Sequence, residues 1–282
     1  MTQTLRIGRI LYTNVWPIFH HFPADRFAGR IELHTEVPST LNRAMAEGRI
    51  DMGPISSFAY GEHAEEYLLF PDLSVSAFGR VNSILLFHKK PLTEIAAGGR
   101  IMLANTSAAS VNLLKILMAK RFAGNPVYRF DEARLSSMRP DEDAALLIGD
   151  DAIRADWSNS DFEVTDLGEL WREWTGRWMS FAVWAVREDA AERHPELLSD
   201  VYRAFLESKR QGLAQPEEMI RHAVQTVGGS EAYWRSYFGG LSFDFGEEQR
   251  KGLQLYYDFA YELGLLNRPA AIRLWQDIPS YR

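Results

Sequence analysis

The sequence predicts an α/β fold of two lobes, with a ligand cleft between the lobes and a helical C-terminal tract. Strand and helix patterns alternate over about the first ninety residues, and a second alternating series begins near Gly98. Two long apolar runs that end in charged residues separate the units, and from Pro195 onward the pattern is almost entirely helical. These three observations favour two α/β units over one.

The first series has the order strand, helix, strand, helix, strand. Residues 5–11 form an apolar strand-like run, and a turn with a short helix is expected over residues 14–22. Residues 31–37 alternate apolar and polar side chains, residues 38–48 place apolar side chains at helical spacing, and residues 50–56 form the next strand. This order implies a parallel sheet with right-handed crossovers.

The second series repeats this alternation. It opens with a strand at residues 98–106 and a helix at residues 107–122. Further strand patterns follow at residues 126–130, 144–153 and 181–189. A second sheet is therefore expected in the middle of the chain.

Two apolar runs, at residues 83–91 and 181–189, are the expected crossings between the lobes. With both as hinge strands, lobe I consists of residues 1–88 and 187–282, and lobe II of residues 89–186. This is the layout of a type II periplasmic-binding-protein-like fold. The alternative is one continuous doubly wound sheet.

The composition excludes several classes of protein and of site. The formal net charge of −7 argues against nucleic acid or an anionic membrane as the main partner. The chain has no cysteine, which excludes disulfides, thiolate nucleophiles and zinc–thiolate sites. No signal-peptide pattern opens the sequence, and no run approaches the roughly 18 apolar residues of a membrane span. A cytoplasmic protein with a small-molecule ligand is expected, and both a monomer and a homodimer remain open.

Candidate site residues lie just after the predicted strands, because parallel sheets bind ligands at the carboxyl ends of their strands. These residues are mostly neutral hydrogen-bonding groups. They are Tyr12, Thr13, Asn14, Ser56, Ser57, Asn105, Thr106, Ser107, Asp150 and Asp151, with Ser83 inside the first crossing run.

Two hydroxyl pairs, Ser56–Ser57 and Thr106–Ser107, stand at the same topological place in the two lobes. Each pair precedes a predicted helix, where backbone N–H groups favour an anion. Two such turns facing each other suit a ligand with two carboxylates. The alternative is that the hydroxyls are ordinary helix N-caps, and both roles can coexist.

The other candidates also have structural alternatives. Ser83 can simply satisfy a backbone group, Asn14 can be a turn residue, and Asp150–Asp151 fits a helix N-cap better than a metal site. Trp171 and Trp184 belong to an aromatic stretch that is more typical of a core than of a pocket. Phosphate loops, nucleophile elbows and zinc-binding helices have no matching motif.

Six sequence blocks, spread in order over about residues 5–190, resemble the chorismate dehydratase family of the futalosine route to menaquinone. They read GRILYTNVWPIF, VPSTLNRAMAEGRIDMGPISSFAY, SVSAFGRVNSILLF, TSAASVNLLKIL, LLIGDDAI, and DLGELWREWTG with FAVWAVRE. The second acidic residue of GDDAI departs from the family pattern, which weakens a role for Asp151 more than one for Asp150.

The resemblance implies a lyase that removes water from chorismate to give 3-[(1-carboxyvinyl)oxy]benzoate, without a cofactor. It points to Asn14 and Ser83 as the residues that act on the substrate. Ser56, Ser57, Thr106 and Ser107 would bind its carboxylates, and Tyr12 and Asp150 complete the expected substrate-binding set.

The motifs offer no paired histidine and carboxylate, so the enolpyruvyl carboxylate of the substrate is the expected proton acceptor. Two alternatives remain: a 1,4-dihydroxy-6-naphthoate synthase-like enzyme of the same pathway, and a non-catalytic protein that binds a small anion.

Overall fold

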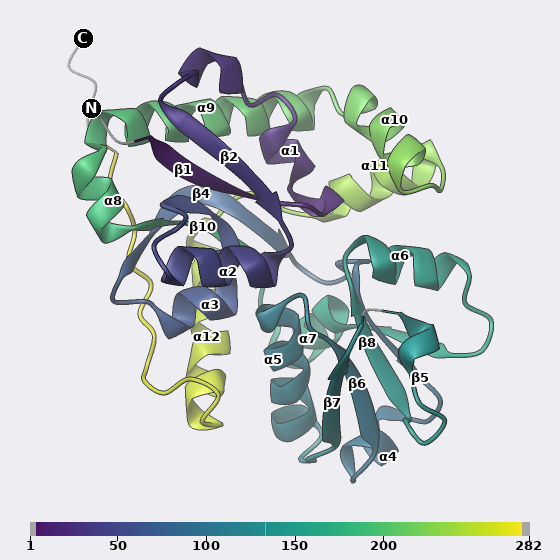
Figure 1. Ribbon diagram of the computed structural model, residues 1–282. Coiled ribbons are helices and arrows are strands. Elements are labelled where there is room, and N and C mark those ends of the chain that lie inside the picture. The colour runs from purple at the N-terminus through teal and green to yellow at the C-terminus, as the bar shows by residue number, and fades with distance from the viewer. Residues whose placement is uncertain (1–3, 133, 278–282) are drawn as a thin grey trace.

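The structure, a computed structural model, describes residues 4–132 and 134–277, and these residues form two lobes, each built on a five-stranded sheet (Figure 1). The strand order is β2-β1-β3-β10-β4 in lobe I and β7-β6-β8-β5-β9 in lobe II. The strands are β1 (Leu5–Ile10), β2 (Ile31–Glu36), β3 (Met52–Ser56), β4 (Tyr67–Ala77), β5 (Ile84–His88), β6 (Arg100–Ala104), β7 (Val127–Asp131), β8 (Ala144–Ile148), β9 (Glu163–Asp166) and β10 (Met179–Arg187).

Helices cover the sheets and make up most of the C-terminal third, as the sequence predicts. Those of the first two thirds are α1 (Trp16–Phe19), α2 (Pro38–Ala46), α3 (Ser57–Glu62), α4 (Leu92–Ala96), α5 (Ala108–Ile116), α6 (Asp150–Trp157) and α7 (Leu167–Thr175). The C-terminal third contributes α8 (Glu188–Arg193), α9 (Pro195–Ala214), α10 (Glu217–Thr226), α11 (Glu231–Gly240) and α12 (Glu247–Glu262). One 3-10 segment, η1 (Thr13–Val15), matters for the site.

Lobe I confirms the predicted parallel pairing of the first three strands. Strands β2 and β3 both pair with β1 in parallel, whereas β10 enters between β3 and β4 and is antiparallel to both. All five residues of β3 are buried. A strand that is covered on both faces has a continuous apolar pattern, which explains why residues 50–56 show little alternation.

The chain crosses between the lobes in loops and not within strands. The two strands that were expected to cross, β5 and β10, therefore each belong to the opposite lobe from the one that the expected boundaries give them. Strand β5, which the range 1–88 places in lobe I, pairs with β8 and β9 in lobe II. Strand β10, most of which the range 89–186 places in lobe II, pairs with β3 and β4 in lobe I. A buried apolar run looks the same in either sheet, so its sequence does not say which sheet it joins. The alternative of one continuous sheet is wrong.

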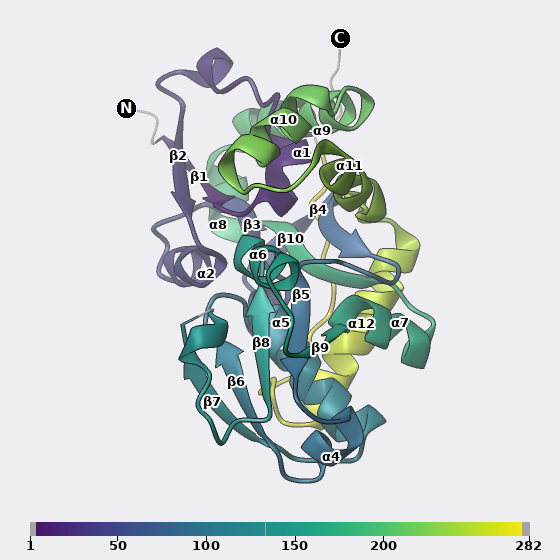
Figure 2. The same ribbon diagram turned by 90° about the vertical axis from the view of Figure 1, so that its right-hand side faces the viewer.

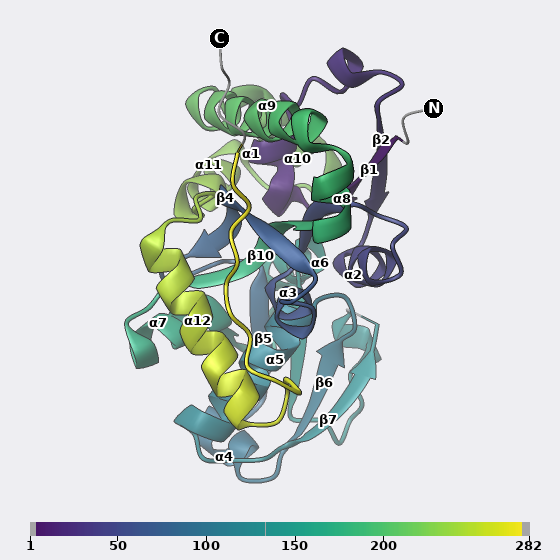
Figure 3. The same cartoon turned by 90° about the vertical axis from the view of Figure 1, so that its left-hand side faces the viewer.

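Helix α12 connects the two lobes along one side of the molecule (Figures 2 and 3). It contacts β10 and α3 of lobe I and α5 of lobe II. Both of its flanks are fixed to strand β4 by isolated bridges, Ser76 to Ser242 and Leu69 to Leu274. The helix is therefore anchored to lobe I and extends over lobe II.

Two tryptophans of the aromatic stretch belong to the core, whereas Trp174 and Trp178 are partly exposed. Trp171 and Trp184 are fully buried, and the Trp171 ring packs edge-on against Tyr256 and Phe259 of α12. This confirms the interpretation as core rather than pocket lining. In the part of the chain that the structure describes, no helix is long and apolar enough to span a membrane.

Candidate active site

A small cavity of about 30 Å³ lies between the lobes, where strand ends of both sheets meet. Five predicted residues line it: Tyr12, Asn14, Ser56, Ser83 and Ser107. The other lining residues are Ile10, Pro38, Ile84, Ser110, Ile148, Gly149, Phe181 and Ala182. All of these side chains are uncharged, so the cavity offers hydrogen bonds and apolar walls.

Three residues of the expected substrate-binding set, Ser57, Thr106 and Asp150, do not line this cavity. Within the described residues, the buried hydroxyl of Ser57 has no hydrogen-bond partner, and that of Thr106 has none of ordinary geometry although it interacts with the Tyr12 phenol. Buried hydroxyls without partners are uncommon in proteins. Both therefore keep donors and acceptors that a rearranged cleft could use.

The Ser56 hydroxyl contacts the opposite lobe instead of capping its own helix. Its Oγ accepts a hydrogen bond from the backbone N–H of Ala109, at 2.9 Å, in the first turn of α5. No side-chain capping bond is present at Ser56 for α3 or at Ser107 for α5. Ser56 thus satisfies an N-terminal donor of lobe II, which is the role that an N-cap normally has.

The Ser107 hydroxyl pairs within its own lobe. Its Oγ lies 3.2 Å from the Oγ of Ser110, one helical turn further along α5. Each hydroxyl has one hydrogen, so this pair uses one and leaves the other free to donate. Ser56 accepts from Ala109 and likewise keeps its hydrogen free. The cavity therefore has one free hydroxyl donor from each lobe.

Asn14 and Tyr12 form one wall of the cavity from lobe I. The buried Oδ1 of Asn14, on η1, has no hydrogen-bond partner among the described residues. The Tyr12 ring packs on Gly149, whose φ of +68° suits glycine and where a Cβ would lie 3.0 Å from the ring. Burial raises the pKa of Tyr12, and a hydrogen bond with Thr106 opposes this shift, so the phenol stays neutral.

Ser83 is held by groups from both lobes. Its carbonyl oxygen accepts from the N–H of Gly149 at 2.7 Å, and its Oγ donates to the carbonyl of Val81 at 3.3 Å. The Tyr237 hydroxyl, on α11, donates to the same Oγ at 3.1 Å. Burial raises the pKa of Tyr237, so its proton stays on the phenol. Ser83 is thus more than a residue that satisfies one backbone group.

Asp150 binds Thr13 across the interface of the lobes and does not cap α6. The Thr13 hydroxyl donates to Asp150 Oδ1, and the N–H of Thr13 approaches the same oxygen at 3.4 Å. Burial raises the pKa of Asp150, and the hydrogen bonds from Thr13 oppose this shift. Asp150 therefore holds the segment that carries Asn14.

Sequence reasoning missed Ser110 and Tyr237. Ser110 follows Ser107 by three residues, so helical spacing alone could have placed both on one face. Tyr237 lies in an aromatic-rich helix more than 150 positions from Ser83, and no local pattern distinguishes it from its neighbours. Among the described residues, no three acidic or histidine side chains gather as metal ligands would.

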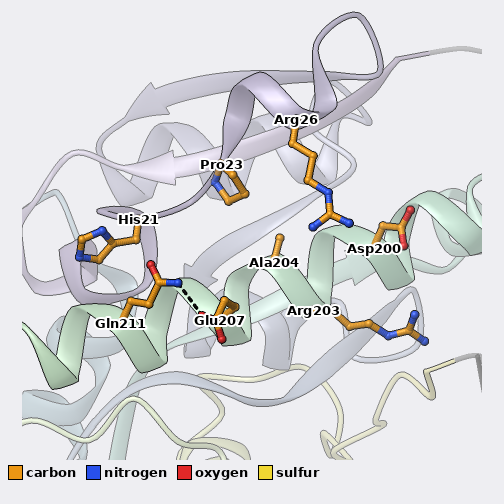
Figure 4. A pocket seen from close by; sticks show the side chains of 8 residues that line it. All are labelled: His21, Pro23, Arg26, Asp200, Arg203, Ala204, Glu207 and Gln211. Carbon is orange, nitrogen blue, oxygen red and sulfur yellow. Dashed lines mark hydrogen bonds between the residues drawn. The ribbon is translucent and has the colours of Figure 1, made fainter.

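A larger hollow of about 510 Å³ lies on the outside of lobe I, between the segment after α1 and helix α9 (Figure 4). Two of its charged groups bind neighbouring side chains: Glu207 accepts from Gln211 and Arg210, and Arg203 pairs with Asp277. It is lined by none of the strand-end residues. The cavity between the lobes is therefore the better candidate for the active site.

The fold and the site define a two-lobed protein of the binding-protein type with an uncharged polar cleft. An X-ray structure of an Archaeoglobus fulgidus protein matches with a TM-score of 0.74 and 21% identity, covering 93% of this chain and 98% of that one. The periplasmic aliphatic sulphonate binding protein of Escherichia coli matches with a TM-score of 0.71 and 17% identity, covering 100% and 96%. These likenesses confirm the predicted fold.

Sequence comparison gives the family. The sequence model of a family described as menaquinone biosynthesis matches residues 5–262. A chorismate dehydratase of Thermus thermophilus is 34% identical over 274 residues, which cover 92% of this chain and 95% of that protein. A 1,4-dihydroxy-6-naphthoate synthase of the same organism is 27% identical over 272 residues, covering 93% and 96%. The chain belongs to the menaquinone biosynthesis family.

Proposed function

We propose that this protein is a chorismate dehydratase, a lyase that converts chorismate to 3-[(1-carboxyvinyl)oxy]benzoate and water. The observation that carries the proposal is the cavity between the lobes, in which Asn14 and Ser83 meet hydroxyl donors of both lobes without a charged side chain. The 34% identity to a dehydratase over nearly the whole chain supports the same reaction.

The reaction needs little chemistry from the protein. The C4–O bond of chorismate breaks and the C3–H bond gives up its electron pair, which completes the aromatic ring. The hydroxyl leaves with the proton as water. Because aromatisation drives the reaction, the enzyme must mainly orient the substrate, exclude water and assist proton transfer.

In this proposal the enolpyruvyl carboxylate of the substrate takes the C3 proton, since Tyr12 is the one ionisable side chain in the described cavity lining and its raised pKa keeps the phenol protonated. Ser83 binds the leaving hydroxyl. Tyr237 donates to the Ser83 Oγ, and the bond from Ser83 to Val81 is long at 3.3 Å. Ser83 can therefore turn its hydrogen towards the leaving group while Tyr237 keeps the oxygen in place.

Asn14 positions the group that takes the proton. Its amide offers both a donor and an unpartnered acceptor, so it can bind the enolpyruvyl carboxylate or the leaving hydroxyl. Asp150 acts indirectly in this proposal, because it binds Thr13, the residue next to Asn14. We therefore assign Asp150 to positioning within the substrate-binding set.

The free hydroxyls of Ser56 and of the Ser107–Ser110 pair, with the Tyr12 phenol, bind the carboxylates. Hydrogen bonds from neutral donors to a carboxylate are stronger than neutral pairs. Ser57 and Thr106 join them when the lobes separate, because in the closed arrangement the Ser57 hydroxyl is buried without a described partner and the Thr106 hydroxyl is buried beside the Tyr12 phenol.

Substrate entry requires the lobes to open. Ligand pockets for small organic molecules usually measure about 300–1,000 Å³, whereas this cavity measures about 30 Å³. Rotation about the loops at residues 78–83 and 176–178 would open it, as in other two-lobed proteins that close on their ligands.

Product analysis tests the proposal. Purified protein incubated with chorismate should give 3-[(1-carboxyvinyl)oxy]benzoate, and Ser83→Ala and Asn14→Ala should each lower the single-turnover rate by about 100-fold or more. Ser199→Ala is the control, because the hydroxyl of this buried serine donates to the Pro195 carbonyl on α9 and lies outside the cavity lining. Binding of chorismate without turnover would indicate an anion-binding protein. Turnover of the cyclic futalosine derivative alone would indicate the naphthoate synthase.

A further inference from the structure

A second space adjoins the cavity and is larger. It is a groove of about 320 Å³ between the lobes, and it shares Ser107 with the cavity. Lobe I lines it through α2 and α3, and lobe II through β6, α5 and β7. A molecule leaving the cavity past Ser107 would enter this groove.

Lys115 is the one cation among the described residues that line the groove. It is half-buried, and its Nζ lies 5.8 Å from the ring centre of Tyr128 and 5.9 Å from that of Phe130. Glu62 of α3 is the one carboxylate among the described residues that line the groove; it forms no ion pair with Lys115, and burial raises its pKa, which favours its neutral form. The two rings attract the ammonium but accept no conventional hydrogen bond, so its three donors stay available.

Aromatic and amide groups surround this ammonium. The Phe58 side chain is buried on the lobe I side, and Phe130 is 54% exposed on the lobe II side. The Asn112 amide donates to the Ala108 carbonyl at 3.0 Å, which leaves its Oδ1 facing outward from that bond. An exposed aromatic ring beside an unpaired cation is suited to a ligand that combines a ring with a carboxylate.

The net charge of the chain makes this cation significant. The chain carries −7 in total, which repels anions at long range, and the cavity lining itself has no positive group. An unpaired, half-buried ammonium also has a desolvation cost, which a ligand carboxylate would offset. Burial lowers the pKa of Lys115, in keeping with the absence of a partner.

We propose that this groove is an outer binding subsite for cyclic and aromatic carboxylates, in which Lys115 binds the carboxylate and Phe130 the ring. The subsite rests on the proposed function, since both substrate and product are then ring carboxylates. It captures the anionic substrate before the lobes close and holds the product before release.

A binding measurement tests the subsite independently of turnover. The probe is 3-hydroxybenzoate, followed by ligand-observed NMR, with benzyl alcohol as the neutral ring control. Lys115→Met keeps the length of the stem and removes the charge, and should weaken 3-hydroxybenzoate binding at least fivefold while leaving benzyl alcohol unchanged. Phe130→Ala, which lines the groove and not the cavity, should weaken both probes.

Kinetics with chorismate give the second readout. Lys115→Met should lower kcat/KM about five- to tenfold, leave the single-turnover rate at saturating substrate unchanged, and make kcat/KM less dependent on salt. The control is Lys120→Met, because Lys120 is already paired with Glu262 and lies over Phe259.

Three results would overturn the subsite. The first is an equal loss of kcat/KM in Lys115→Met and Lys120→Met. The second is an unchanged affinity of Lys115→Met for 3-hydroxybenzoate. The third is a lower Tm of Lys115→Met with an unchanged KM, which would make Lys115 a structural cation. Lys115-dependent probe binding in a protein that does not dehydrate chorismate would remove the proposed function and leave the carboxylate subsite standing.

Discussion

The two strand-to-helix turns of the cleft occupy the same place in their lobes and use their hydroxyls differently. In lobe I, Ser56 extends across the interface to the N–H of Ala109. In lobe II, Ser107 pairs with Ser110 on its own helix. Topological equivalence therefore does not make the two turns a symmetric clamp.

The difference shows how closure is coupled to binding. Ser56 contacts lobe II only when the lobes are together, and by accepting from Ala109 it keeps its own hydrogen for a ligand. Ser107 and Ser110 keep their pair whatever the position of lobe I. We infer that the hydrogen bond of the lobe I turn forms only on closure, whereas the hydrogen bond of the lobe II turn is present before closure.

Replacing the two serines separately should give the largest difference. Ser56→Ala removes a donor to a carboxylate and leaves the buried Ala109 N–H unpaired. Since a hydrogen bond to a charged group contributes about 1.5–3 kcal/mol, KM should rise about 10- to 100-fold. In Ser107→Ala the neighbouring Ser110 still donates, so KM should rise less than about fivefold. Steady-state kinetics with chorismate measures both.

The double variant Ser107→Ala with Ser110→Ala is the control for this comparison. It removes every hydroxyl of the pair and should reach the effect of Ser56→Ala. Equal effects of the two single variants would show a symmetric clamp and contradict the inference.

Trp157 of lobe II packs against helix α11 of lobe I. Its ring, at the end of α6, packs edge-on against Tyr233 and Trp234 and lies over Gly229. A Cβ at Gly229, where φ is +79°, would lie 2.5 Å from the indole. Gly229→Ala should push the indole away, weaken closure, and lower stability by about 1–3 kcal/mol. Thermal unfolding and small-angle scattering would detect the two effects.

Gly264→Ala is the matched control for Gly229. Its φ is +66°, and a Cβ there would meet no atom within 4 Å, so only the backbone strain remains. The cost of Gly229→Ala should also shrink when Trp157 is replaced by Ala, because the clash is then gone. An undiminished cost in that background would show that backbone strain alone is responsible.

Two neighbouring tyrosines of α12 each contact one of the two turns, and replacing them should have smaller effects than replacing the serines. The Tyr257 hydroxyl donates to the carbonyl of Ser57 at 2.7 Å, within lobe I, and the Tyr256 hydroxyl donates to the carbonyl of Ala109 at 3.1 Å, in lobe II. Each Tyr→Phe change should cost about 1 kcal/mol of stability, because a buried carbonyl loses its donor. Only Tyr256→Phe should also raise KM, about two- to fivefold, since α12 moves with lobe I. A rise in KM for Tyr257→Phe would contradict that assignment.

The fold and five cavity residues could be predicted because they depend on local patterns. Alternating strands and helices define a parallel sheet, and the carboxyl ends of its strands meet at one edge. Tyr12, Asn14 and Ser107 lie just beyond such an end, Ser56 is the last residue of β3, and Ser83 directly precedes a strand of lobe II. The order of strands and helices therefore predicts which residues stand at the cleft-facing edge of each sheet.

The remaining site residues depend on packing over long separations. Tyr237 reaches Ser83 from α11, and Lys115 lies on α5 among apolar neighbours, so its spacing indicates only a helix. The hydrogen bond between Ser56 and the other lobe depends on how closely the lobes approach each other. No periodicity in one segment encodes these contacts, because they arise only when distant elements pack.

The contact of Asp150 with Thr13 gives the smallest expected effect, and its sign follows from the raised pKa of Asp150. Burial raises that pKa above the ordinary value of 3.8, so the ionised carboxylate is less favourable in the folded protein than in the unfolded chain. The contribution of Asp150 to the free energy of unfolding is therefore greatest below about pH 3.8, and it is lost as the pH rises through the higher pKa that Asp150 has in the folded protein.

Asp150→Asn tests this sign, because it keeps an oxygen that accepts from Thr13 and removes the ionisation. The Tm of the variant relative to the wild type should thus increase with pH, by about 1–2 °C between pH 4 and 7. Asp151→Asn, at the exposed neighbouring position, should show no such trend. A difference that favours the wild type increasingly towards neutral pH would mean that the Thr13 hydrogen bonds outweigh burial, and that the ionised carboxylate itself holds the lobes together.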